Sequence, residues 1–277
     1  MTLLVVIPSN SFSISENYGR PKCNCVVFRL DDLKDTEFRT GQIIPMQLFL
    51  SKNQTLSLAL IMGWIGNDSK VISKVQEGVS KGLFELGIHG WDHTDYRKLT
   101  QKEQRNSLEL ANEKMKLLFG KESEIFIPPD GEFNNDTIKV MSQLGFRIIS
   151  SGMWAEENFD QGKSIFNATD KVQEYESLRE QISHVPATIS FKDYSNGKWI
   201  KNSIQNILNN ATHSIYKYGY AVIVIHPQDF LKIENMKFVD IPVSNEVNDL
   251  SLLINSILSR NIHIVSYSKL VGIEANK

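Results

Sequence analysis

Residues 25–32 read CVVFRLDD, an apolar run that ends in two adjacent aspartates. Valine and phenylalanine favour extended backbone, so the run predicts a β-strand over 25–30. Comparable β-rich runs recur along the chain at 56–62, 84–89, 124–129, 147–151, 182–191, 221–226 and 262–267. The first strand is thus one of a series, and the segments between the runs indicate how the series is connected.

Those segments carry apolar residues at three- and four-residue intervals, which predicts amphipathic helices. They cover 41–53, 69–82, 100–120, 135–145 and the regions around 200–218 and 246–260. Thr100 and Glu103 form the pattern of a capping box, and Gly120 is typical of a helix end. The alternation of strands and helices predicts an α/β fold of repeated βα units around a parallel sheet.

The chain has 277 residues, enough for one barrel-sized domain or two ordinary ones. No repeat, low-complexity tract or composition break divides it, so we expect one domain over residues 25–277 with an irregular excursion at 152–181. Residues 1–24 join a short apolar stretch to a Ser- and Asn-rich one, and are interpreted as a signal-peptide remnant or a poorly ordered leader. A signal would place the protein outside the cell or at its surface; without one it would be cytoplasmic.

Charge and hydropathy argue against two kinds of partner. Thirty Lys and Arg against 32 Asp and Glu give a net charge of -2 without a basic block, so nothing indicates a nucleic-acid partner. No apolar run approaches the roughly 18 to 20 residues that a membrane span requires.

Cys23 and Cys25 are the only cysteines. On an extended strand, residues two apart point to the same face without favouring a disulfide between them. We therefore expect two small side chains that pack at the start of a strand, with a redox or metal-binding role as the alternative.

Polar residues suited to chemistry follow four of the predicted strands: Asp31 with Asp32, His89 with His93, Asp130, and His226 with Asp229. In parallel α/β barrels the carboxyl ends of the strands meet on one rim, where active sites lie. One such residue is often structural or a helix cap. Four sites on the same rim together indicate a metal-assisted hydrolase.

The residue types fit that chemistry. A catalytic zinc typically takes three His or carboxylate ligands and keeps one position for water, and Asp32, His89 and His93 supply that number. Neighbouring aspartates on an extended segment point in opposite directions, so Asp31 is a candidate general base that approaches the water from a different angle. His226 lies across the rim as a candidate acid for the leaving group.

Four motifs, VFRLDD (27–32), HGWDH (89–93), FIPPDG (126–131) and VIVIH (222–226), resemble in order and spacing those of the polysaccharide deacetylases of carbohydrate esterase family four. The resemblance spans roughly residues 25–230, and the R-L-D-D motif is similar to that of a divergent deacetylase-like branch. It implies a single distorted (β/α) barrel of about seven parallel strands, a divalent metal, most often zinc, and hydrolysis of N- or O-acetyl groups on a polysaccharide or glycan.

Position by position, the resemblance implies the same roles: Asp31 as base, Asp32, His89 and His93 as metal ligands, and His226 as acid. The sequence departs from the family's pattern elsewhere. Gly90 replaces a Ser or Thr, although glycine lets the chain turn there. Ile127 replaces an arginine that orients the base, so Asp31 must be held differently or be less well tuned. Asp130 replaces a tyrosine whose backbone N–H contacts the oxyanion, a contact that Asp130 can still offer.

Other residues carry weaker signals, each with a structural alternative. His184 is a candidate for contact with substrate or metal, or a buried strand histidine. Asp229 is a candidate to orient His226, or a helix cap. Trp91 and Trp154 are candidates to stack on sugar rings, or packing residues.

We expect an enzyme, a metal-dependent carbohydrate deacetylase whose partner is an acetylated polysaccharide or glycan. The first alternative is a different amide or ester hydrolysis on the same metal site. The second is a carbohydrate-binding protein that keeps the metal site without turnover.

Overall fold

The computed structural model describes residues 23–35, 37–152, 182–195 and 198–272. Trp154, nearly all of the predicted leader and nearly all of the predicted excursion at 152–181 lie outside the described residues. Within them, no helix is long and apolar enough to cross a membrane.

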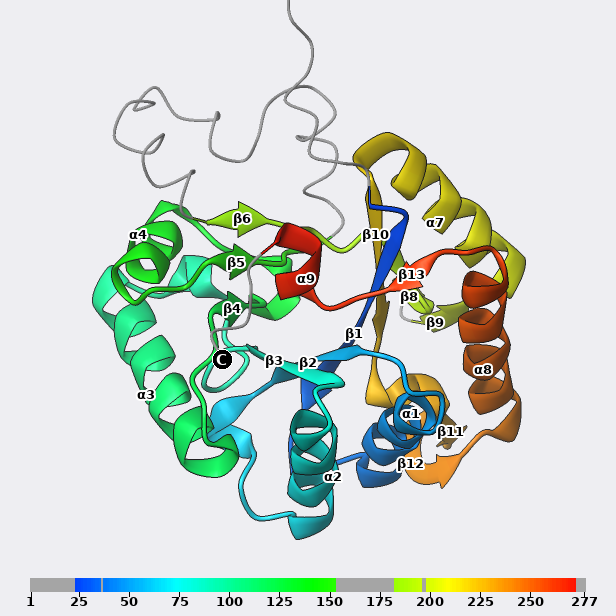
Figure 1. The fold of residues 1–277 in the computed structure, drawn as a ribbon. Coiled ribbons are helices and arrows are strands. Elements are labelled where there is room, and N and C mark those ends of the chain that lie inside the picture. The colour runs from blue at the N-terminus through cyan, green and yellow to red at the C-terminus, as the bar shows by residue number, and fades with distance from the viewer. Residues whose placement is uncertain (1–22, 36, 153–181, 196–197, 273–277) are drawn as a thin grey trace, which may run out of the picture.

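A nine-stranded parallel sheet forms the centre of the described structure (Figure 1). Its strand order is β6-β5-β4-β3-β2-β1-β10-β7, and β13 pairs with β1. The strands are β1 (Cys25–Leu33), β2 (Leu56–Leu60), β3 (Phe84–Ile88), β4 (Ile125–Phe126), β5 (Ile148–Ile149), β6 (Ser183–His184), β7 (Ile189–Ser190), β10 (Tyr220–Ile225) and β13 (His263–Ile264). The sheet curls into a half-barrel with β1 near its middle, and the predicted α/β barrel class is confirmed.

The helices surround the curled sheet on its outer side, except the short last one, Tyr267–Val271, which packs against the core inside the curl (Figure 1). They are α1 (Arg39–Ser51), α2 (Ser69–Ser80), α3 (Gln101–Phe119), α4 (Asn135–Gln143), α7 (Ile204–Tyr218), α8 (Ser244–Ser259) and α9 (Tyr267–Val271), with 3₁₀ turns at Met62–Trp64, Tyr96–Lys98, Pro129–Gly131 and Pro227–Phe230. The predicted capping box of α3 is confirmed, since Glu103 N–H donates to Thr100 Oγ1 at 3.3 Å and Thr100 N–H to Glu103 Oε2 at 2.8 Å. Gly120 ends α3 at φ 75°.

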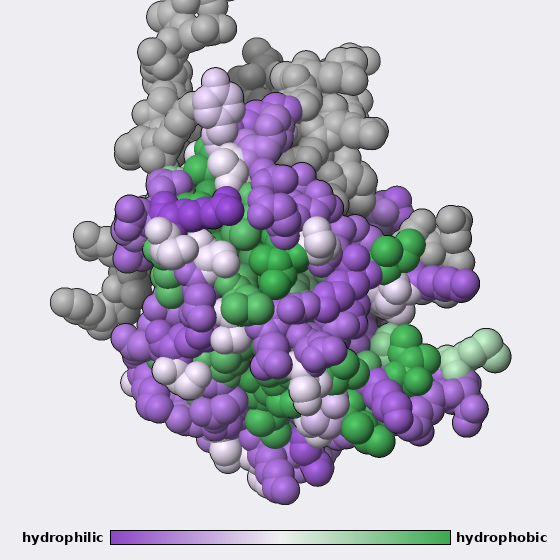
Figure 2. Space-filling view, turned by 90° about the vertical axis from the view of Figure 1, so that its right-hand side faces the viewer, coloured by the Kyte–Doolittle hydropathy of each residue, from purple (hydrophilic) through white to green (hydrophobic). Residues whose placement is uncertain are grey.

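The sheet is buried on both faces. Val26, Phe28 and Leu30 of β1 belong to the hydrophobic core that includes buried residues of the surrounding helices, whereas Cys25 and Val27 belong to the core inside the curl. The helices expose their polar sides, and the face that carries α7 and α8 is mostly hydrophilic (Figure 2). Because the core inside the curl is apolar, polar side chains there are exceptional and indicate where the site lies.

The described structure differs from the expected elements in places. The single strand expected over 182–191 is divided into β6 and β7, because Pro186 between them has no N–H to donate to a sheet. Two antiparallel hairpins were not predicted: β8 (Lys192–Ser195) with β9 (Lys198–Lys201), and β11 (Leu231–Glu234) with β12 (Lys237–Pro242). The first of these hairpins reaches the candidate site.

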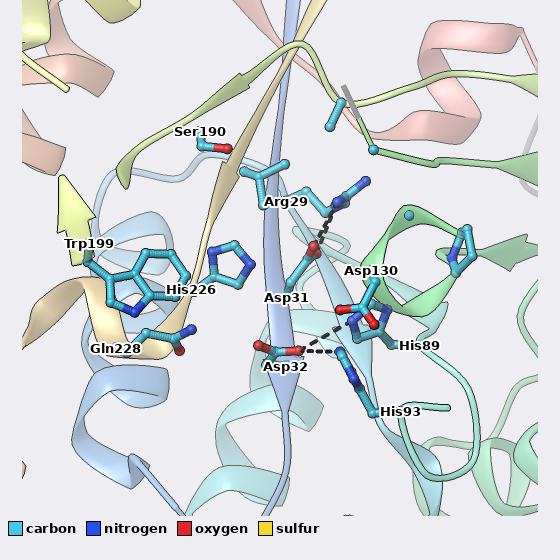
Figure 3. A pocket seen from close by; sticks show the side chains of 15 residues that line it. Arg29, Asp31, Asp32, His89, His93, Asp130, Ser190, Trp199, His226 and Gln228 are labelled. Atoms are coloured by element: carbon cyan, nitrogen blue, oxygen red, sulfur yellow. Dashed lines mark hydrogen bonds and ion pairs between the residues drawn. The ribbon is translucent and has the colours of Figure 1, made fainter. Parts of the chain in front are cut away.

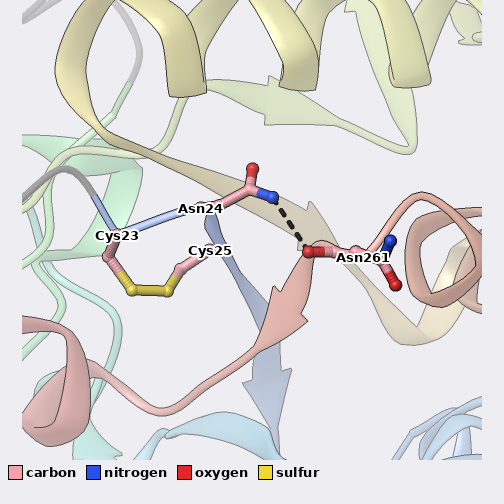
Figure 4. The surroundings of a disulfide bond; sticks show 4 residues. All are labelled: Cys23, Asn24, Cys25 and Asn261. Carbon is pink, nitrogen blue, oxygen red and sulfur yellow. Dashed lines mark hydrogen bonds between the residues drawn. A yellow bond between two sulfur atoms is a disulfide. The ribbon is translucent and has the colours of Figure 1, made fainter.

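Cys23 and Cys25 form a disulfide (Figure 4), so the expectation of two unbridged cysteines was wrong. The backbone turns before β1 instead of being extended, since the N–H of Cys25 donates to the carbonyl of Cys23 at 2.7 Å. The turn holds the two Cα atoms 5.1 Å apart, within the range that a disulfide spans.

Candidate metal centre and active site

A cavity of about 590 Å³ opens at the carboxyl ends of β1, β3 and β10 (Figure 3). Six of the residues predicted at strand ends line it: Asp31, Asp32, His89, His93, Asp130 and His226. The fold thus brings together side chains that are up to almost two hundred residues apart in sequence.

Asp32, His89 and His93 form a compact group whose donor atoms all lie within 4.8 Å of one another. Asp32 Oδ1 is 3.3 Å from His89 Nε2 and 3.2 Å from His93 Nε2. Two imidazoles and a carboxylate that converge in this way match the donor set of a catalytic zinc site. The residues therefore fit a divalent metal.

The ring of His89 is oriented by the strand next to it. His89 Nδ1 lies 2.7 Å from the carbonyl oxygen of Ile127. A carbonyl oxygen only accepts hydrogen bonds, so Nδ1 carries the proton and Nε2 keeps its lone pair for a metal. Ile127 thus contributes to the site through its backbone.

The charges of the group also suit a metal. Burial alone would raise the pKa of Asp32, but its close contacts with His89 and His93 hold that pKa well below its ordinary value. Burial alone would lower the pKa of His93, whereas the contact with Asp32 and the carboxylates of Asp130 and Asp31 raise it. Asp32 is thus an anion ready to bind, and a metal would compete with a proton for His93.

A bulge in β1 lets both aspartates face the cavity. On a regular strand Asp32 would point to the helix-covered side with Leu30, away from Asp31. Instead, Asp32 has φ 61° and the pairing of β1 with β2 shifts register between Leu30 and Leu33. A one-residue bulge of this kind re-aims a side chain, and here both carboxylates line the same cavity.

Arg29 holds Asp31, and the sequence reasoning did not find it. Arg29 Nε and Nη2 donate to the two carboxylate oxygens of Asp31 at 2.8 and 2.7 Å. Arg29 Nη1 donates to the carbonyl oxygen and Oγ of Ser150 at 3.1 and 2.8 Å, and Ser150 Oγ is 2.7 Å from the Tyr267 hydroxyl. Residues two apart on a strand lie on the same face, so the spacing of Arg29 and Asp31 was the signal in the sequence that could have predicted this pair.

We expect Arg29→Met to destabilise the protein by about 3 to 5 kcal/mol, because it leaves the carboxylate of Asp31 buried without its partner. The two side chains are only 6% and 5% exposed. Urea unfolding of the metal-free protein at pH 7 measures the change.

Arg39→Met is the matched control. Arg39 pairs with Asp68 but is 51% exposed, and Asp68 also accepts hydrogen bonds from the backbone of Lys70 and Val71. That variant should lose about 1 kcal/mol or less. Equal losses of unfolding free energy in the two variants would mean that the Arg29–Asp31 pair contributes no more to stability than a surface ion pair does.

His226 follows β10 on the cavity wall, and a hydrogen bond to its backbone holds it there. Asp229 Oδ2 accepts a hydrogen bond from the N–H of His226 at 2.8 Å, which is the capping contact foreseen as the alternative for Asp229. Burial raises the pKa of Asp229 to about 6. Asp229 Oδ1 and His226 Nδ1 are buried without a hydrogen-bond partner among the described residues.

The remaining predicted site residues lie in different surroundings. Asp130 lines the cavity in a backbone conformation with φ 57°. His184 does not line it: its Nε2 lies 2.7 Å from Ser151 Oγ, its ring contacts Phe133, and burial lowers its pKa to about 4. Trp91 also lies off the cavity, where it packs against Gly63 and under the ammonium of Lys114. The geometry of His184 and Trp91 corresponds to their structural alternatives.

Residues 19–149, nearly half of the chain, match the family model for polysaccharide deacetylases. A stretch of 143 residues is 26% identical to the uncharacterized protein YlxY of Bacillus subtilis strain 168, and covers 51% of this chain and 41% of that protein. The chain thus spans less than half the length of that curated relative. The resemblance to the deacetylase family is confirmed, whereas the R-L-D-D branch stays a prediction.

Solved structures share the fold over most of the chain. A candidate polysaccharide deacetylase from Mycobacterium smegmatis matches with a TM-score of 0.63 and 14% identity, over 91% of this chain and 90% of its own. A cobalt-bound family 4 acetyl xylan esterase from Clostridium thermocellum matches at 0.56 and 12%, over 90% and 91%. A family 4 pseudoenzyme from Bacillus anthracis matches at 0.57 and 13%, over 92% and 68%. At these identities the likeness concerns the fold.

Proposed function

We propose that this chain, a relative of the polysaccharide deacetylases, is a metal-dependent hydrolase that removes N- or O-linked acetyl groups from a polysaccharide or glycan. One observation carries the proposal: the converging donor atoms of Asp32, His89 and His93 share a cavity with a separate, arginine-held carboxylate, Asp31. Ligands alone would suffice to bind a metal. A second carboxylate beside them supplies the proton acceptor that hydrolysis by an attacking water needs.

Asp32, His89 and His93 would hold the ion, and zinc suits a site of two imidazoles and one carboxylate. When bound, the ion lowers the pKa of water and polarises the carbonyl of the acetyl group. Asp31 takes the proton of the attacking water, and the two hydrogen bonds from Arg29 fix the direction of its carboxylate. His226 delivers a proton to the departing nitrogen or oxygen of the sugar.

Asp130 is the proposed source of the oxyanion contact through its backbone N–H. Its turn follows Pro128 and Pro129, two residues that fix their own φ, and Gly131 N–H bonds back to the carbonyl of Pro128 at 3.0 Å. A turn closed in this way holds the peptide at the cavity edge.

We also propose that the protein works outside the cell or at its surface, where an acetylated polysaccharide would be met. The Cys23–Cys25 disulfide supports this location, because disulfides persist mainly in oxidising compartments.

Acetate release from acetylated chitin, peptidoglycan and xylan oligomers tests the function. We expect the zinc-loaded full chain to release acetate from at least one of them, the chelated chain to release none, and added zinc to restore the activity. Release of a different acyl group would favour another amide or ester hydrolase on the same site. Binding without release would favour a carbohydrate-binding protein, an alternative consistent with a pseudoenzyme among the fold neighbours.

A further inference from the structure

Trp199 forms a wall of the cavity, although it comes from a hairpin outside the main sheet (Figure 3). It lies on β9, and the centroid of its ring is 5.8 Å from that of His226, at an interplanar angle of 55°. Gln228 lines the cavity below it. A large, partly exposed aromatic ring thus stands directly beside the proposed acid.

The β8–β9 hairpin is attached to the rest of the fold by two lysines. Lys192 Nζ donates to the carbonyl oxygen of Asp229 at 2.6 Å and lies 3.4 Å from Glu246 Oε1. Lys201 Nζ lies 2.8 Å from Glu246 Oε2 and also pairs with Asp249. These contacts tie the strand that carries Trp199 to α8 and to the turn after His226. The indole is therefore held in position before any ligand arrives, which reduces the entropic cost of binding.

The order of the residues across the cavity indicates which part of the substrate lies next to Trp199. In Figure 3 the metal-ligand group lies on one side, Trp199 lies on the other, and His226 stands between Trp199 and Asp31. The acetyl carbonyl belongs next to the metal ligands, and the leaving atom belongs next to His226. What continues past His226 is the leaving group, which is the sugar and not the acetyl methyl.

We propose that Trp199 is a specificity-determining residue that stacks on the pyranose ring carrying the acetyl group, while Gln228 bonds to the hydroxyls of that ring. The inference rests on the proposed function and adds a substrate class to it, a neutral sugar with one exposed C–H face. Such a face packs on the electron-rich face of an indole, and a side-chain amide both donates to and accepts from hydroxyls.

Calorimetric titration of the metal-free full chain with two probes, N-acetylchitotetraose and acetylated xylotetraose, tests the inference without turnover. We expect Trp199→Ala to weaken binding of at least one probe by about tenfold. Trp199→Phe, which keeps an aromatic face, should retain most of the affinity. The matched control is Ile200→Ala, since Ile200 is the next residue on β9, points to the opposite face of the strand and is 53% exposed. It should bind as the parent does.

Three results would overturn the inference: unchanged affinity in Trp199→Ala, an equal loss in Ile200→Ala, or no binding of either probe by the parent chain. Acetate release is measured separately on the zinc-loaded protein, so that failure of the stacking role can be distinguished from failure of the proposed function. If a probe binds in a way that depends on Trp199 but no acetate is released, the proposed hydrolase activity is rejected and the stacking role of Trp199 stands. If acetate is released but the affinity does not depend on Trp199, only the stacking role is rejected.

Discussion

Replacing His93 by alanine is expected to abolish the retention of a divalent metal, and His89→Ala should do the same. A site with three protein ligands tolerates the loss of one poorly, because the two that remain neither enclose the ion nor balance its charge. Asp32 Oδ1 lies 3.2 Å from His93 Nε2 and 3.3 Å from His89 Nε2, so each imidazole stands at the carboxylate that would share the ion with it. Elemental analysis after zinc loading and desalting measures the effect.

His184→Ala is the control for this prediction. His184 is also a strand histidine, but it contacts Ser151 and Phe133 and does not line the cavity. It should keep about one zinc per chain, as the parent should. Stoichiometric zinc in His89→Ala or His93→Ala would contradict the ligand assignment. Loss of zinc in His184→Ala alone would mean that the metal is bound at His184 and not in the cavity.

Asp31→Asn should leave the metal in place and lower turnover by about 100-fold or more, the effect of losing a general base. The amide has nearly the shape of the carboxylate but cannot accept the proton of the attacking water. The change also leaves the guanidinium of Arg29 without its anion, although Ser150 still accepts two of its hydrogen bonds. Zinc content and single-turnover acetate release, measured on the same preparation, separate binding from chemistry.

Asp130→Asn makes the same chemical change in the same cavity and serves as its control. Asp130 contributes to the proposed chemistry through its backbone, so its amide variant should lose far less activity than Asp31→Asn. Loss of zinc in Asp31→Asn would mean that the roles of Asp31 and Asp32 are exchanged. Equal losses of turnover in the two variants would show only a general need for negative charge near the metal.

The sequence by itself determined the fold class and named the three residues that converge as a candidate metal site. Strand periodicity and helix signals are local, since they depend on which side chains suit an extended or helical backbone, and β1, β2, β3 and β10 formed close to where they were expected. In a parallel sheet the carboxyl ends of strands share one edge. Placing Asp32, His89 and His93 at strand ends was therefore enough to expect all three on one rim, although the direction of the Asp32 side chain did not follow from it.

Only the tertiary structure decided how the site is completed. The bulge that turns Asp32 into the cavity is a register shift against β2, and the hairpin that carries Trp199 is held by α8 and by the turn after His226. Arg29 was readable as a polar residue in an apolar strand, but its link through Ser150 to Tyr267 joins residues more than a hundred positions apart. Such contacts arise from packing between distant elements, and no local pattern records which elements will meet.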